Sequence, residues 1–109
     1  MDTPAPETLT RLERVIADRS TGDAASSYVA RLLADAPALP ARKLGEEAVE
    51  TVVAALSGSR AELTSEAADL LFHLLVLLRA NDVPLADVLA ELDRRDGLSG
   101  LDEKAARQS

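Results

Sequence analysis

The sequence predicts an all-α fold, a bundle of about five helices that assembles as a homo-oligomer. The 109-residue chain is 47% hydrophobic but only 2% aromatic, so its core must consist mainly of Ala, Leu and Val. Such residues pack well in helix bundles, whereas a β-sandwich normally contains more aromatic and β-branched residues. No segment alternates with the period of a strand. The length suits one domain covering residues 1–109.

Two helices are expected before the third. The first begins at Pro4, because a proline suits the first turn and Thr3 offers a cap. Turn-forming residues end this helix near 20–23. The second helix begins within 23–29 and is broken by the prolines of segment 36–40.

The third helix is expected from Pro40 or Ala41 to about Leu56, where the residues SGS at 57–59 interrupt the pattern. We expect an antiparallel hairpin between this helix and the next one. The fifth helix should cover 85–95.

The fourth helix starts with Ser59 and Glu62, which fit a capping box, and continues to about Ala80. Its second half is apolar all round, so it must be covered all round. The other helices of so short a chain leave part of that surface for a partner chain, and small domains often gain stability by associating. We therefore expect a homo-oligomer, with a dimer as the first choice. Gly97 should stop the fifth helix, and the polar tail from about residue 98 should be frayed.

Charge and composition exclude several classes of function. A net charge of −7 argues against binding to a nucleic-acid backbone, which needs a basic face. The absence of cysteine excludes disulfides, thiolate catalysis and Cys-type zinc sites. The N-terminus does not resemble a signal peptide, and the longest apolar stretch, 70–78, is far shorter than the roughly 18 residues of a membrane span. We expect a cytoplasmic protein that binds neither membranes nor nucleic acid.

Five acidic residues in the third and fourth helices form the main candidate site. Glu46, Glu47 and Glu50 form one arc of the third helix, and Glu66 and Asp69 share a face of the fourth. An apolar stripe of valines and Leu56 borders that arc. If the stripe belongs to the core, Glu46 and Glu50 at its border should be partly buried.

The hairpin would place the carboxylates of the two helices at about the same distance from the turn that joins them. Glu50 precedes the 57–59 turn by about seven residues and Glu66 follows it by about seven, so each lies roughly 10 Å from the turn. Carboxylates that converge in this way need a counter-charge, and Mg²⁺ or Mn²⁺ prefers such oxygen ligands. The alternative is an ordinary solvated acidic face, because the chain has 19 acidic residues.

The same residues carry a family resemblance. The pattern E-E-x-x-E at 46–50 followed by E-x-x-D at 66–69 is similar to the signature of the all-α nucleoside triphosphate pyrophosphohydrolases, the MazG-like superfamily. ARKLGEEAVETVVAA at 41–55 and SEAADLLFHLLVLL at 65–78 resemble the phosphoribosyl-ATP pyrophosphohydrolase branch. Phe72 stands where this branch often has tyrosine, a departure that concerns packing more than chemistry.

The resemblance implies hydrolysis of the α–β phosphoanhydride of N1-(5-phosphoribosyl)-ATP to phosphoribosyl-AMP and pyrophosphate, in histidine biosynthesis. It also implies assembly as dimers or larger oligomers. Mg²⁺ would be held by Glu47, Glu50, Glu66 and Asp69. Glu46 would be a further ligand, an outer-sphere group or the residue that orients water. The general base, among the candidate catalytic residues Glu46, Glu47 and Glu50, stays open.

Four further residues have both a functional and a structural interpretation. Lys43 suits a phosphate oxygen or an ordinary surface pair with Glu46 or Glu47. His73 either orients Asp69 through a hydrogen bond or is a core histidine satisfied by its neighbours, and both interpretations are favoured over direct metal ligation or a general-base role. Ser27 and Tyr28 suit substrate contact, capping or packing equally well.

Two rival functions remain open on the sequence alone. The first is a pyrophosphohydrolase of other nucleoside triphosphates, including non-standard dNTPs, which the acidic motif does not distinguish. The second is a non-catalytic helical dimerisation module, which predicts no stabilisation by Mg²⁺ and no turnover.

Overall fold

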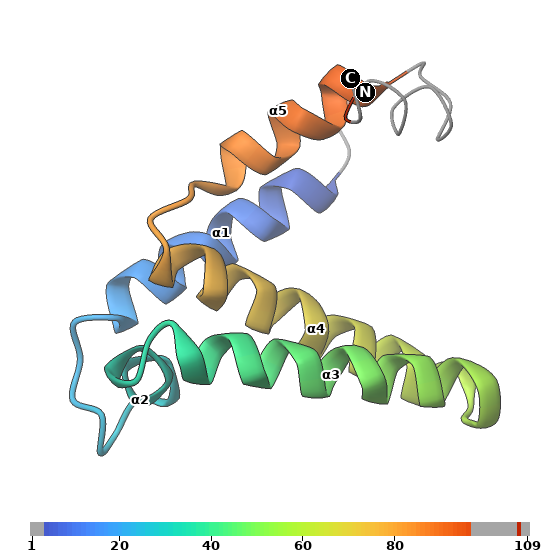
Figure 1. Cartoon of the computed structure of the whole chain (residues 1–109), viewed down its shortest axis with the longest axis horizontal. Helices are drawn as coiled ribbons and strands as arrows, with labels where there is room; N and C mark the ends of the chain where they lie inside the picture. Colours follow the sequence, from blue (N-terminus) through green and yellow to red (C-terminus); the bar gives the residue numbers. More distant parts are fainter. Residues whose placement is uncertain (1–3, 97–106, 108–109) are drawn as a thin grey trace.

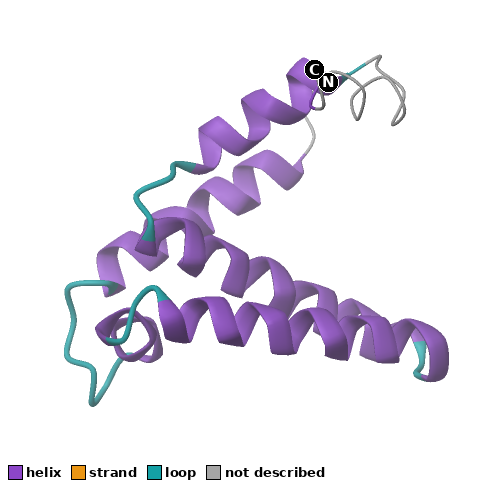
Figure 2. Cartoon of the chain, in the orientation of Figure 1, coloured by secondary structure: helices purple, strands orange, loops and turns teal. Residues whose placement is uncertain are grey.

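Five helices account for most of the chain that the structure, a computed structural model, describes: residues 4–96 and 107. No strand occurs among those residues, and Figure 2 shows helices joined by short loops. The all-α prediction is therefore confirmed. The helices are α1 (Pro4–Arg19), α2 (Tyr28–Ala34), α3 (Ala38–Ser57), α4 (Arg60–Ala80) and α5 (Leu85–Arg95).

The helices form an open V. In Figure 1, α3 and α4 lie side by side as one arm, α1 and α5 form the other arm, and α2 lies near the vertex. The Cα radius of gyration is 15.9 Å, compared with about 13 Å expected for a compact domain of this length. The single chain is therefore less compact than a typical domain and leaves much apolar surface uncovered.

The hydrophobic core lies near the vertex, where α1, α2, α4 and the start of α5 meet. Leu9, Leu12 and Phe72 are among the partly buried residues that pack around it. Aliphatic residues at helical spacing supply this core, as the composition predicted. Its buried members are Ile16, Val29, Leu32, Leu75, Val76 and Leu85.

Local signals explain the helix boundaries. Ser59 and Glu62 form the capping box that the sequence predicted, each side chain bonding the other residue's backbone N–H. Helix α3 begins at Ala38, slightly before the predicted start. Pro40 is tolerated there because the N–H groups of a first helical turn have no intrahelical acceptor. Thr3, Gly97 and the tail from residue 98 lie outside the described residues.

The inner face of α3 differs from the sequence-based expectation. Val49, Val52 and Val53 are 55–63% exposed and Leu56 is 83% exposed, so the apolar stripe is not part of the core of this chain. The inner face instead carries Pro40, Lys43, Leu44, Glu47, Ala48, Thr51 and Ala54. Small residues on this face let α3 approach α4 closely, since interaxial distance depends on side-chain size.

Glu46 and Glu50 are exposed rather than partly buried, and this corrects the expectation for them. Glu47, one residue along from Glu46, takes the inward position.

In the described part of the chain, no helix combines the length and the apolar character that crossing a bilayer requires.

Candidate metal centre

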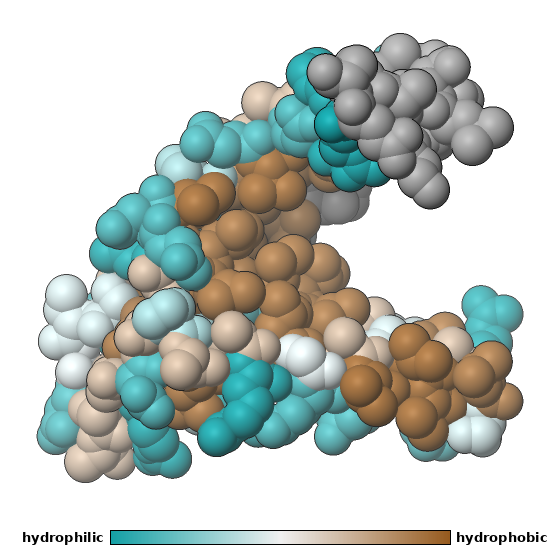
Figure 3. Space-filling view, in the orientation of Figure 1, coloured by the Kyte–Doolittle hydropathy of each residue, from teal (hydrophilic) through white to brown (hydrophobic). Residues whose placement is uncertain are grey.

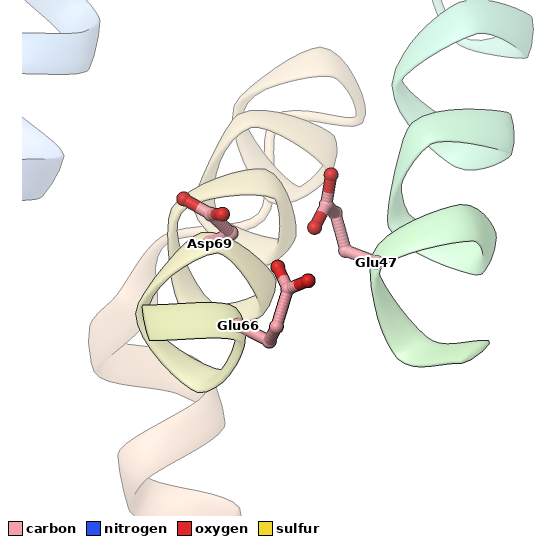
Figure 4. A group of neighbouring side chains, drawn as sticks. All are labelled: Glu47, Glu66 and Asp69. Atoms are coloured by element: carbon pink, nitrogen blue, oxygen red, sulfur yellow. The ribbon is translucent and has the colours of Figure 1, made fainter. Parts of the chain in front are cut away.

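Three carboxylates from α3 and α4 converge in the arm that these helices form. Glu47, Glu66 and Asp69 each offer an oxygen, and these oxygens lie within 4.8 Å of one another. Figure 4 shows Glu47 reaching from α3 toward α4, where Glu66 and Asp69 project from neighbouring turns. Their i,i+3 spacing places Glu66 and Asp69 on one helix face. The cluster thus combines residues from both predicted acidic segments.

The environment of Glu47 favours a cation. Its Oε2 atom is buried and has no hydrogen-bond partner among the described residues. Burial is the main cause that raises the pKa of Glu47, and the nearby charge of Glu50 raises it further. A buried, unpaired carboxylate oxygen is costly without a partner, so this site is chemically suited to a hard cation.

The pKa of Glu66 is raised for related reasons. Partial desolvation has the largest effect, followed by the charges of Glu50 and Asp69. Glu50 is exposed and stands outside the three-residue cluster, yet its charge acts on both Glu47 and Glu66. The structure therefore brings Glu50 to the edge of the cluster.

Glu46 points to a different set of partners. Its carboxylate pairs with Nζ of Lys43 at 3.2 Å and with Nε of Arg42 at 3.7 Å. The hydrogen bond with Glu46 is the main cause that raises the pKa of Lys43, and nearby Tyr28 raises it further. The surface pair considered for Lys43 is present, and the same ammonium lies near Tyr28 and Glu47.

His73 is buried, with 5% of its surface exposed. Its Nδ1 atom lies 2.8 Å from the backbone oxygen of Asp69, so Nδ1 carries the proton and donates it to that carbonyl. In the neutral ring, Nε2 then accepts from the hydroxyl of Tyr28 at 2.9 Å. His73 contacts the carbonyl of Asp69, not its carboxylate, as a core histidine satisfied by its neighbours does.

Tyr28 and Ser27 open α2. The Tyr28 ring stacks on Phe72 with centroids 6.1 Å apart, yet Tyr28 remains 43% exposed. Ser27 is the N-cap of α2, and its hydroxyl oxygen accepts from the N–H of Ala30. Capping thus gives Ser27 a structural task, while Tyr28 presents surface beside Lys43.

Sequence reasoning missed Thr51. Its hydroxyl lies 2.7 Å from the backbone oxygen of Glu47 and 3.2 Å from that of Glu66. Thr51 follows Glu47 by one helical turn, so its place on the same face of the helix was readable from the sequence. Its contact with the neighbouring helix was not.

Comparison with known proteins places this chain in a family. The family model described as phosphoribosyl-ATP pyrophosphohydrolase matches residues 9–96. Proteins named phosphoribosyl-ATP pyrophosphatase are similar over nearly the whole chain. The one from Erythrobacter litoralis is 65% identical over 92% of this chain and 96% of its own.

Two further relatives carry the same name. The protein from Novosphingobium aromaticivorans is 60% identical over 94% of this chain and 96% of its own length. The one from Paracoccus denitrificans is 54% identical over 99% of this chain and 100% of its own. The chain therefore belongs to the phosphoribosyl-ATP pyrophosphohydrolase family.

Proposed function

We propose that this chain hydrolyses phosphoribosyl-ATP to phosphoribosyl-AMP and pyrophosphate, in histidine biosynthesis. Water attacks phosphorus, the α–β phosphoanhydride bond breaks, and pyrophosphate leaves. The observation that carries the proposal is the family match across residues 9–96, which includes every carboxylate of the cluster. We also propose that the chain acts as one domain, since the core joins α1 to residues of α2, α4 and α5.

We propose that Glu47, Glu66 and Asp69 hold Mg²⁺, or Mn²⁺, with Glu50 completing the set at the edge. The fit rests on the oxygen-only donors and the unpartnered buried Oε2 of Glu47. When bound, the ion neutralises carboxylate and phosphate oxygens and makes the phosphorus more electrophilic. Removing the charge of any one ligand should therefore weaken ion binding and turnover together.

Other residues of the chain would bind and orient the substrate. Lys43 carries a positive charge beside the acidic cluster, and we assign it a phosphate oxygen. The exposed part of Tyr28 lies near that ammonium and forms a second surface for the substrate. We assign the orientation of the attacking water to Glu50, whose carboxylate is exposed, and to Glu46, whose exposed carboxylate also pairs with Lys43 and Arg42.

We infer that α3 and α4 form an antiparallel hairpin that holds these groups at one depth. Only Gly58 and Ser59 join the two helices, and the bond from Thr51 to Glu66 supports the pairing.

We also infer a homo-oligomer, with a dimer as the simplest form. Figure 3 shows apolar surface lining the inside of the V and the far part of the α3–α4 arm. The exposed valine stripe of α3 is further apolar surface that the single chain leaves uncovered.

Pyrophosphate release from phosphoribosyl-ATP, measured with and without Mg²⁺ and beside a panel of dNTPs, tests the function. We expect turnover of phosphoribosyl-ATP only when Mg²⁺ is present. Faster turnover of a dNTP would instead favour the broader pyrophosphohydrolase, and no turnover of any nucleotide would favour the dimerisation module.

Asp69→Asn and Glu50→Gln test the ligand assignments. Asp69→Asn should reduce turnover by at least about a hundredfold and Glu50→Gln by less, because Glu50 lies outside the cluster. Glu7→Gln, on an exposed face of α1, serves as the control and should leave the rate unchanged. Near wild-type turnover by Asp69→Asn would remove that residue from the centre.

Val53→Asp tests the oligomer. Val53 is 55% exposed in the single chain, so a charge there should leave the fold intact while it opposes burial against a second copy. Sedimentation should show the wild type as an oligomer and the variant shifted toward monomer. A monomeric wild type would contradict the inference.

A further inference from the structure

The hydroxyl of Thr51 joins the two helices that carry the acidic cluster. It bonds the backbone oxygen of Glu47 within α3 at 2.7 Å and lies 3.2 Å from the backbone oxygen of Glu66 in α4. Both carbonyls belong to residues whose side chains are in the cluster. A single half-buried hydroxyl therefore touches the backbone of a carboxylate-bearing turn on each helix.

The chemistry of a hydroxyl defines this contact. Threonine has one O–H donor, so the proton is shared between the two carbonyls in a three-centre bond. Each carbonyl has two lone pairs, and the helix ladder uses one of them. Thr51 fills the second, so loss of the hydroxyl leaves neither carbonyl without its helical partner. The bond therefore links the two helices, and neither helix needs it to complete its own backbone hydrogen bonds.

We propose that Thr51 is a positioning residue that fixes the spacing of Glu47 relative to Glu66 and thereby sets the affinity of the centre for a divalent cation. This inference rests on the proposed metal-dependent function. Mg²⁺ demands nearly ideal octahedral geometry, so its affinity depends on how well the protein holds the ligand oxygens in place. Groups that orient metal ligands typically change metal affinity by 10–100-fold when they are removed.

The other cluster residue has a comparable link. The carbonyl of Asp69 accepts from Nδ1 of His73, so each of the three cluster residues has its backbone oxygen bonded by a side-chain donor. Of these two donors only Thr51 bonds both α3 and α4, so it adds a hydrogen bond between the two helices that carry the ligands.

Thr51→Val tests the proposal, because valine keeps the β-branched shape and lacks the hydroxyl. The full-length chain is titrated with MgCl₂ in a calorimeter. We expect the Kd for Mg²⁺ to rise about tenfold in Thr51→Val and to return to nearly the wild-type value in Thr51→Ser. The Mg²⁺ concentration that half-saturates turnover should rise by a similar factor.

Thr64→Val is the matched control. The hydroxyl of Thr64 also bonds the carbonyl four residues earlier, that of Arg60, at 2.8 Å, but within the described residues it makes no bond to another helix. The Kd of this variant for Mg²⁺ should equal that of the wild type. If Thr51→Val does not fold, Thr51→Ala is titrated against the same expectation.

The outcomes separate the inference from the function on which it rests. If Thr51→Val melts at a lower temperature but binds Mg²⁺ like the wild type, Thr51 has only a structural role and the inference is wrong. If the wild type itself binds no Mg²⁺, the metal centre fails and the inference falls with it. An equal loss in Thr64→Val would also overturn the inference, since helix distortion would then explain both effects.

Discussion

The hydroxyl of Tyr28 donates to Nε2 of His73 at 2.9 Å and so ties the first residue of α2 to the buried face of α4. The other ring nitrogen of His73 bonds the carbonyl of Asp69. One imidazole therefore connects the surface beside Lys43 to the backbone of a cluster residue. The only histidine of the chain acts here through two hydrogen bonds inside a nearly closed environment.

Tyr28→Phe should lower the free energy of unfolding by about 1 kcal/mol, because the buried Nε2 of His73 loses its donor. The phenylalanine ring can keep the stacking on Phe72, so the change removes only the bond. Urea unfolding measures the loss. On a His73→Phe background the same substitution should have almost no effect, and an equal loss there would show that the bond is not responsible.

The metal-free protein should lose stability as pH rises from about 4.5, the unfolded value for glutamate, through the raised folded pKa values of Glu47 and Glu66. A carboxyl with a raised pKa binds more protons in the folded state, so deprotonation in this window favours unfolding. Thermal midpoints in EDTA should fall less with pH in Glu47→Gln than in the wild type.

At neutral pH, Mg²⁺ should restore the stability that the metal-free protein loses as pH rises. Binding to the folded state alone raises the melting temperature, and it requires deprotonated ligands. The increase should be present in the wild type and largely absent in Glu47→Gln. In the metal-free experiment in EDTA, pH profiles that run parallel in the wild type and in Glu47→Gln would show that Glu47 is not the source of the loss of stability with pH.

Gly45→Ala should stabilise the protein by up to about 1 kcal/mol, since glycine within a helix costs about that much relative to alanine. A Cβ at this position would meet no heavy atom within 4 Å in the described chain. Unfolding by urea measures the gain. If turnover falls while stability rises, the space beside Gly45 is needed by the substrate or a second copy.

Glu13→Ala should destabilise the protein by about 1 kcal/mol through α5. The Oε2 atom of Glu13 accepts from the N–H of Leu85 at 2.7 Å, and the N-cap residue Pro84 provides no side-chain bond. A carboxylate at a helix N-terminus adds a favourable interaction with the helix dipole. Glu7→Ala, on the same helix and paired with nearby Arg11 across 3.6 Å, should change stability by much less. Equal losses in both variants would show that the cap is unimportant.

The sequence by itself determined the class of fold and the residues from which a site could be made. Helical spacing, prolines and the Ser59 capping box define the helices to within a few residues, because these signals are local. The short interruption at 57–59 also implied that Glu66 lies level with the glutamates of the preceding helix. The bond from Thr51, the residue after Glu50, to the carbonyl of Glu66 agrees with this expectation that the two stretches lie at the same height along the paired helices.

The tertiary structure alone decided which face of α3 looks inward. By periodicity, the valine stripe was the expected inner face, and Glu46 and Glu50 the expected border. In the fold, the less exposed face of α3 carries Ala48, Thr51 and Ala54, and the hydroxyl of Thr51 contacts α4. Glu47 on that face is turned into the cluster, and the valines are left exposed. Hydrophobic periodicity shows that a face will be buried, but not whether the same chain or another copy buries it. That choice depends on how closely two helices can approach, which is a property of their packing and not of either sequence segment alone.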